Sequence, residues 1–244
     1  MRLIILGCYT PYPPPGGACL GYLLKGEKTQ VLLEFGSGVM SRLQEFIPFW
    51  ELDAVVLSHL HGDHMSDLGV YRYAADQAVI EGKRRGPIPV WALPEPEEVF
   101  TTLTYKEALE SQKIKPGQDI TIGEFTFTFL PTRHALPCVA MRITDGNKTL
   151  VYTGDTEYFS ELVDFAKGAD LLLAEATYLR KDLEAGATGH LSAGQAARIA
   201  HEAGVKRLIL THLRSWYKTS DLLEEARGIF SDCQVAVERA IVEI

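Results

Sequence analysis

Ser58-His59-Leu60-His61-Gly62-Asp63-His64 places three histidines and an aspartate close together, in a chain with only seven histidines among 244 residues. Imidazole nitrogens and carboxylate oxygens are the atoms that zinc and similar divalent ions bind. In an extended segment His59 and His61 point to the same side, whereas a turn at the glycine directs Asp63 and His64 to a neighbouring position. The spacing therefore predicts two adjacent metal sites.

The segment follows Ala54–Leu57, an apolar and β-branched run that is typical of a strand buried on both faces. Outward from it, the chain divides into two halves with the same order of elements: a hairpin, a helix and a buried strand. In the first half these are Cys19–Leu24 with Gln30–Phe35, Ser37–Phe46 and Ala54–Leu57. In the second half they are Val139–Ile143 with Thr149–Tyr152, Ser160–Lys167 and Leu171–Ala174. This duplication predicts two sheets packed face to face, with helices on the outer faces, in one domain spanning residues 1–244.

Other elements are predicted from local patterns. Leu3–Leu6 is expected to be a strand, and the run Tyr9–Gly17, rich in proline and glycine, is expected to be a loop. A strand is predicted at Val90–Leu93 and a helix over Glu97–Glu110. The alternating apolar residues of Asp119–Leu130 predict paired strands with a turn at Gly123.

Composition excludes several classes of protein. Hydrophobic residues make up 46% and charged residues 23%, as in ordinary globular proteins, so disorder is not expected. The net charge of -8 disfavours an electrostatic nucleic-acid binder, and the basic cluster Gly82–Gly86 is interpreted as a solvated loop. The four cysteines form no C-x-x-C pair and are expected to be reduced. No apolar run is long enough to span a membrane, so we expect a cytoplasmic protein with no membrane partner.

The pattern His-x-His-x-Asp-His after a buried strand resembles the signature of the metallo-β-lactamase superfamily. The resemblance implies an α/β fold, an αββα four-layer sandwich with two duplicated half-domains. It also implies three further ligands: His134 in Pro131–His134, a bridging Asp155 in Tyr152–Thr156, and His212 in Leu208–His212. Together with His59, His61, Asp63 and His64, these residues would hold two divalent ions, expected to be zinc, with manganese as the alternative.

Within the superfamily, the chain is most similar to ribonuclease Z and its smaller relatives. This likeness lies in Ala174–Tyr178, Gly189–Ala193 and Leu210–Leu213. It implies that Glu175 orients His190, and a carboxylate that fixes an imidazole tautomer suits a general acid near neutral pH. Asp63, Glu175 and His190 are therefore the expected catalytic residues. Tyr178 and Arg214 are candidates for contact with the substrate, whereas His201 is expected on the helix surface.

The chain also departs from ribonuclease Z. His64 and His134 are separated by only 70 positions, which leaves no room for the long arm that binds tRNA. Glu34 stands where the family's D-x-G turn has aspartate. The leading hypothesis is therefore a dinuclear phosphodiesterase that acts on a small-molecule or short nucleotide phosphodiester through a metal-bridging hydroxide.

Three alternatives remain open. The same metal centre could hydrolyse a lactone or thioester, or the chain could be a tRNA 3′-processing endoribonuclease of the ribonuclease Z type. A non-catalytic metal-binding or RNA-binding scaffold is the alternative from another class. Long RNA is disfavoured as a substrate, and a homodimer is implied by the family resemblance alone.

Overall fold

The chain forms two seven-stranded sheets in the computed structural model, which describes residues 1–244. Each half of the chain supplies one sheet, except that the C-terminal strand β16 joins the sheet of the first half. The first sheet has the strand order β16 (Ile241–Glu243), β1 (Arg2–Gly7), β3 (Gly21–Lys25), β4 (Gln30–Leu33), β5 (Ala54–Val56), β6 (Ile88–Ala92) and β7 (Leu109–Lys113). The second has the order β15 (Cys233–Val235), β13 (Leu208–Thr211), β12 (Leu171–Glu175), β11 (Thr149–Tyr152), β10 (Val139–Thr144), β9 (Phe125–Pro131) and β8 (Ile120–Ile122).

The two sheets repeat one pattern of strand directions. From β16 to β7, three antiparallel pairs are followed by three parallel pairs. From β8 to β15, the same six pairings occur in the same order. The hairpin β10–β11 turns at Gly146 and the hairpin β8–β9 at Gly123, and both glycines have the positive φ that glycine adopts without a steric penalty. The predicted duplication is thus confirmed strand by strand.

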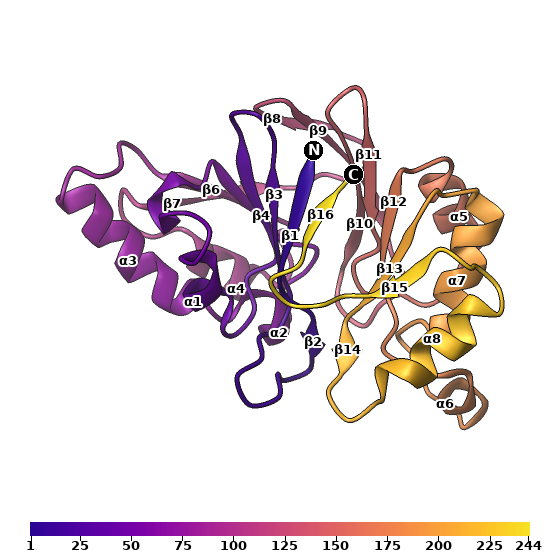
Figure 1. Ribbon diagram of the computed structural model, residues 1–244. Helices are drawn as coiled ribbons and strands as arrows, with labels where there is room; N and C mark the ends of the chain where they lie inside the picture. Colours follow the sequence, from indigo (N-terminus) through magenta and orange to yellow (C-terminus); the bar gives the residue numbers. More distant parts are fainter.

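Helices cover the outer faces of both sheets, which gives the four layers of the predicted αββα sandwich (Figure 1). The first half contributes α1 (Val39–Leu43), α2 (Gly62–Met65), α3 (Leu68–Ile80) and α4 (Glu97–Phe100), with 3₁₀ turns η1 (Phe49–Glu51) and η2 (Thr101–Leu103). The second contributes α5 (Ser160–Ala166), α6 (Arg180–Glu184), α7 (Ala193–Ala203) and α8 (Thr219–Arg227). No helix is both long enough and apolar enough to cross a membrane.

Helix α7 illustrates how the sequence sets these layers. Ser192 caps its first turn by accepting a hydrogen bond from the Gln195 amide, and the Gln195 side chain accepts one from the Ser192 amide in return. The helix ends at Gly204, whose φ of 62° is the left-handed conformation of a helix C-cap. Its buried face consists mainly of alanines, and these short side chains let the helix pack closely against β12 and β13.

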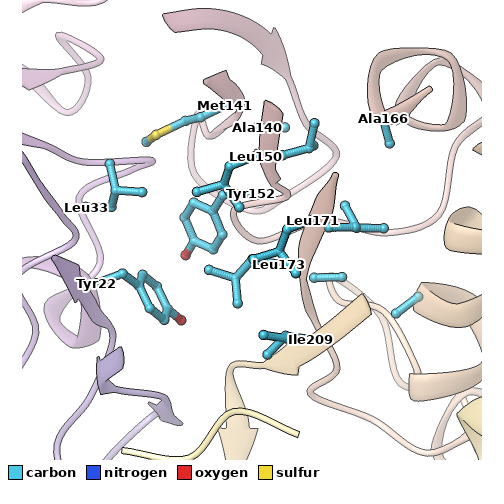
Figure 2. Close-up of a cluster of buried hydrophobic side chains, with 14 of the residues drawn as sticks. Tyr22, Leu33, Ala140, Met141, Leu150, Tyr152, Ala166, Leu171, Leu173 and Ile209 are labelled. Carbon is cyan, nitrogen blue, oxygen red and sulfur yellow. The ribbon is translucent and has the colours of Figure 1, made fainter. Parts of the chain in front are cut away.

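Two tyrosines join the sheets at the centre of the molecule. Tyr22 from β3 and Tyr152 from β11 point toward one another in Figure 2, with their ring centroids 5.5 Å apart. The Tyr22 hydroxyl is 2.6 Å from the Thr211 hydroxyl oxygen, whereas the Tyr152 hydroxyl is buried without a protein partner. Burial raises the pKa of both phenols well above their usual range. Around these two rings the contact between the sheets is therefore apolar apart from the hydrogen bond between Tyr22 and Thr211.

The helix predicted over Glu97–Glu110 is wrong. The helical turns end at Leu103, and β7 begins at Leu109 and pairs with β6. The hydroxyls of Thr101 and Thr102 donate to the carbonyls of Glu98 and Val99, and such local hydrogen bonds weaken a helix. Lys106 has a positive φ of 47°, which a right-handed helix does not contain. A run of β-branched threonines also disfavours continuation of a helix.

One smaller prediction also needs correction. Tyr9–Gly17 is not entirely a loop, because Tyr9 and Thr10 form the short strand β2, which pairs with β14 (Leu213–Arg214). Strand β2 has no local sequence signal, since it exists only because a strand from the far end of the chain lies beside it. The histidine-rich segment follows its prediction: His61 is extended, and the chain turns at Gly62, where α2 begins.

The two central tyrosines provide a test of this packing. Replacement of Tyr152 by phenylalanine removes a buried hydroxyl that has no protein partner, so we expect the free energy of unfolding to rise by roughly 1 kcal/mol. Tyr22→Phe removes the hydrogen bond to Thr211 and should lower it by about the same amount. Urea titrations of the metal-loaded proteins would measure both shifts. If Tyr152→Phe were the more destabilising of the two, the Tyr152 hydroxyl would have to make a hydrogen bond, contrary to the structure.

Candidate metal centre

The residues predicted as ligands meet at one edge of the sandwich. The parallel strands of both sheets end there, and the chain segments that leave these strand ends carry the ligands. Figure 1 shows α2, β2 and β14 at this edge, beneath the two sheets. The first half supplies the segment after β5 and the start of α2, and the second half supplies the segments after β9, β11 and β13: His59, His61, Asp63 and His64, then His134, Asp155 and His212.

Four of these side chains form a first cluster: His59, His61, His134 and Asp155. His61 Nδ1 lies 2.8 Å from His59 Nε2 and 3.2 Å from His134 Nε2. Asp155 Oδ2 lies 3.6 Å from His59 Nε2 and 3.7 Å from His134 Nε2. Ligands of a tetrahedral zinc ion are separated by about 3.3 Å, given metal–ligand bonds of about 2.0–2.1 Å. The four atoms are therefore spaced to surround one ion.

A second cluster lies beside the first: Asp63, His64 and His212. Asp63 Oδ2 is 3.7 Å from His64 Nε2 and 3.5 Å from His212 Nε2, and these two nitrogens are 3.4 Å apart. Asp155 Oδ2 closes this cluster too, at 3.5 Å from His64 Nε2 and 3.2 Å from His212 Nε2. One carboxylate oxygen thus belongs to both clusters, which is the geometry of a bridging ligand.

Hydrogen bonds behind the ligands fix which ring nitrogen faces the centre. His59 Nδ1 contacts the Ser58 hydroxyl at 3.0 Å, and His134 Nδ1 lies 3.0 Å from the Gly189 carbonyl oxygen. His212 Nδ1 lies 2.6 Å from the Thr177 hydroxyl. Because the outer nitrogen is engaged in each case, Nε2 is left for a metal ion.

Glu34 contacts both ends of the histidine-rich segment, at Ser58 and at His64. Sequence reasoning missed this role. Glu34 directly follows β4 with φ 59°, a left-handed conformation that is uncommon outside glycine. Its fully buried carboxylate accepts a hydrogen bond from the Ser58 amide at 3.1 Å and lies 3.4 Å from His64 Nδ1. The sequence showed Glu34 only as a departure from the family's aspartate; the structure shows a carboxylate behind a metal ligand.

The buried carboxylates of the centre are stabilised by positive charge around them. Burial opposes ionisation of Asp155, but the imidazoles of His212, His64 and His59 hold the pKa of its carboxyl well below the usual range. Burial alone would lower the pKa of His64, yet the carboxylates of Asp155 and Glu34 raise it well above normal. Asp155 Oδ1 and His64 Nδ1 are also buried without a hydrogen-bond partner. Without an ion, the imidazoles of His64 and His212 must supply the positive charge that the buried carboxylates need. Divalent metal ions at the two positions would supply that charge instead and would leave the imidazoles neutral, as ligands must be.

Glu175 and His190, the predicted acid pair, adjoin the metal clusters. Glu175 Oε1 lies 3.0 Å from His190 Nδ1 and also accepts a hydrogen bond from the Thr156 amide at 2.7 Å. The other carboxylate oxygen accepts a hydrogen bond from the Thr177 hydroxyl at 2.7 Å. Glu175 is fully buried, whereas His190 lines an open cavity of about 580 Å³ together with Asp63 and other ligands. His201, as expected, is exposed on α7.

The Beta-lactamase superfamily domain model matches residues 39–213 of this chain, more than two thirds of its length. The chain belongs to the metallo-β-lactamase superfamily. A probable metallo-hydrolase, YhfI of Bacillus subtilis, is 39% identical over 231 residues, which cover 95% of this chain and 94% of that protein. The crystal structure of YhfI superposes with a TM-score of 0.96 at 37% identity, over 100% of this chain and 99% of that one.

More distant relatives share the fold. Ribonuclease Z of Thermobifida fusca is 28% identical over 291 residues, covering 94% of this chain and 90% of that protein. A diphosphatase of the PhnP family is 19% identical with a TM-score of 0.80, over 100% of this chain and 97% of that one. The superfamily, the resemblance to YhfI and the clustered ligands together identify a metallo-hydrolase.

The shared oxygen of Asp155 predicts how two aspartate variants differ. Asp63→Ala should weaken one metal site and leave the other occupied, because Asp63 contacts only the cluster with His64 and His212. Asp155→Ala should lower the occupancy of both sites. Elemental analysis of protein reconstituted with zinc should give about two ions per chain for the wild type, about one for Asp63→Ala and fewer than one for Asp155→Ala. Equal metal loss in the two variants would contradict the bridging role.

Proposed function

We propose that this metallo-hydrolase is a dinuclear phosphodiesterase acting on small-molecule or short nucleotide phosphodiesters, with zinc as its ion. The observation that carries the proposal is the pair Glu175–His190 beside the metal clusters. Cleavage of a phosphodiester produces an alkoxide, a poor leaving group that gains most from a proton delivered as the bond breaks. A thioester releases a thiolate, which leaves readily without a proton, so the pair favours the phosphodiester over a thioester.

The geometry orients the proposed acid. Because His190 Nδ1 faces Glu175, the opposite nitrogen of the ring is left for the substrate. Glu175 itself cannot turn away, since its two oxygens are held by the Thr156 amide and the Thr177 hydroxyl. Glu175 is therefore a positioning residue, and His190 is the group that would hold a proton toward the leaving oxygen.

His190 also lies within reach of the metal clusters, since its Nδ1 is 3.9 Å from Asp155 Oδ2. The nitrogen nearest the clusters is, however, the one that lies 3.0 Å from the carboxylate of Glu175. This contact supports a role for His190 in proton transfer and not as a metal ligand. Exposure does not separate the two roles, because the candidate ligand His61 lines the same cavity and is also partly exposed.

Bound divalent ions would supply positive charge for the non-bridging phosphate oxygens and would make a water molecule easier to ionise near neutral pH. The protein's own contribution is to place acceptors and donors around that position. Asp63, which lines the cavity, is held by a hydrogen bond that it accepts from the Thr10 hydroxyl at 2.8 Å. It would orient the attacking water.

The size of the site supports a small substrate. A cavity of about 580 Å³ falls within the usual range for small-molecule sites, roughly 300–1,000 Å³. The net charge of -8 gives no general attraction for a long polyanion. Two relatives are called a ribonuclease and a diphosphatase, names for enzymes that break bonds to phosphorus, which also supports the proposed class of reaction.

The proposal predicts a specific kinetic effect of His190→Ala. The variant should keep its metal and fold, while kcat for an alkyl phosphodiester falls by roughly 10²- to 10⁴-fold, because the leaving alkoxide loses its proton donor. The loss should be much smaller with p-nitrophenolate as leaving group. Glu175→Gln should give a weaker form of the same pattern. Steady-state kinetics on both kinds of diester would measure these effects.

The matched control is His201→Ala, which removes the one histidine outside the site and should leave kcat unchanged. If His190→Ala retains full activity on the alkyl diester, the general-acid role is refuted. A wild-type enzyme that is inactive on phosphodiesters but active on a lactone or thioester would replace the proposed function with the alternative.

A further inference from the structure

A continuous series of planar groups runs from His190 to the rim of the cavity. The Tyr178 ring lies edge-on to His190, with centroids 5.7 Å apart. The Arg214 guanidinium is 4.4 Å from the Tyr178 centroid and 5.2 Å from that of Trp216. The Trp216 ring is in turn 6.1 Å from Tyr12, at an interplanar angle of 38°. We call these five residues the aromatic ladder.

The ladder is built on the backbone of the metal centre. His212, a metal-ligand candidate, has φ 57°, and this left-handed turn ends β13 and starts β14. Strand β14 then pairs with β2, with Arg214 opposite Thr10. The loop after β2 carries Tyr12, and the turn after β14 carries Trp216. The two outer rings are therefore held beside each other by the same small sheet that adjoins the ligands.

The outer end of the ladder is open to solvent. Tyr12 is 57% exposed and Trp216 53% exposed, although burial of either ring would be favourable. Tyr12 also lines the cavity that contains His190 and the metal ligands. An exposed pair of aromatic rings at the mouth of a polar cavity is a surface on which a planar group can stack.

Arg214 is held by aromatic faces and has no carboxylate partner. Its guanidinium lies over the rings of Tyr178 and Trp216, which attract a cation through the ring quadrupole. By contrast, Arg180 forms an ion pair with Glu184. Arg214 thus places a positive charge between Tyr178 and Trp216, on the way to the rim.

We infer that the aromatic ladder is a nucleobase subsite, so that the substrate is a nucleoside phosphodiester. This inference rests on the proposed function for the position of the phosphate at the metal end of the cavity. The base would stack on Trp216 and Tyr12, and the sugar would span the space between them and His190. A base is favoured over an alkyl or glycerol group because only a planar π-system uses both the ring faces and the neighbouring cation.

Two chromogenic substrates with one leaving group separate the subsite from the chemistry. Thymidine 5′-(p-nitrophenyl) phosphate carries a base, and methyl p-nitrophenyl phosphate does not. Trp216→Ala should lower kcat/KM for the thymidine ester by roughly 5- to 150-fold, the loss expected for one base–aromatic stack, and should change that of the methyl ester by less than about 2-fold. Trp216→Phe should restore most of the loss, because it keeps a ring at this position.

Trp50→Ala is the matched control, because Trp50 lies outside the cavity and contacts Lys83 on the surface. This variant should hydrolyse both esters at the wild-type rate. The base subsite is refuted if Trp216→Ala affects both esters equally, or neither of them.

If the wild type cleaves neither ester, the proposed function fails, and binding then tests the ladder on its own. AMP should quench tryptophan fluorescence in the wild type but not in Trp216→Ala, and ribose 5-phosphate should quench it in neither. Equal quenching by AMP in Trp216→Ala and in the wild type would overturn the inference, whatever the enzyme hydrolyses.

Discussion

The buried carboxylate of Asp155 is the constraint on which the rest of the structure depends. Its Oδ2 lies within 3.9 Å of nitrogens of His59, His64, His134, His190 and His212. An ionised group removed from water is costly unless positive charge or hydrogen bonds replace its solvation. No single strand or loop could assemble that many partners. The fold meets this demand by bringing the ends of strands from both sheets to one point.

The internal duplication explains why the centre lies at the junction of the halves. Each sheet ends its parallel strands at the same edge, and packing the sheets face to face brings the two edges together. Each metal cluster therefore takes ligands from both halves: His59 and His61 meet His134, while Asp63 and His64 meet His212. Bound ions would hold the halves together as well as act in catalysis, because distant parts of one chain would share each ion.

Sequence reasoning succeeded where chemistry and local pattern coincide. Four candidate ligands could be named from the histidine-rich segment itself, because histidine is scarce in this chain, and the family resemblance implied His134, Asp155 and His212. The structure brings these seven side chains together. Sequence reasoning failed for Glu34, whose contact with His64 depends on a turn that aligns residues 30 positions apart. Strand β2 was missed for a similar reason, since its partner β14 lies some 200 residues away. The supposed helix over Glu97–Glu110 was an error of local pattern, because the chain turns at Lys106 and then pairs with β6 as β7.

The left-handed backbone at Glu34 and His212 has a consequence for how such a sequence evolves. A side chain other than glycine or asparagine in this conformation costs roughly 1–2 kcal/mol, which the contacts of these two side chains at the metal centre must offset. Selection for stability alone would favour glycine at both positions. Glycine at position 212 would remove a candidate metal ligand, and glycine at position 34 would remove the carboxylate that contacts the ligand His64. A glycine at either position in a descendant of this chain would therefore mark a lineage that has kept the architecture and abandoned the chemistry.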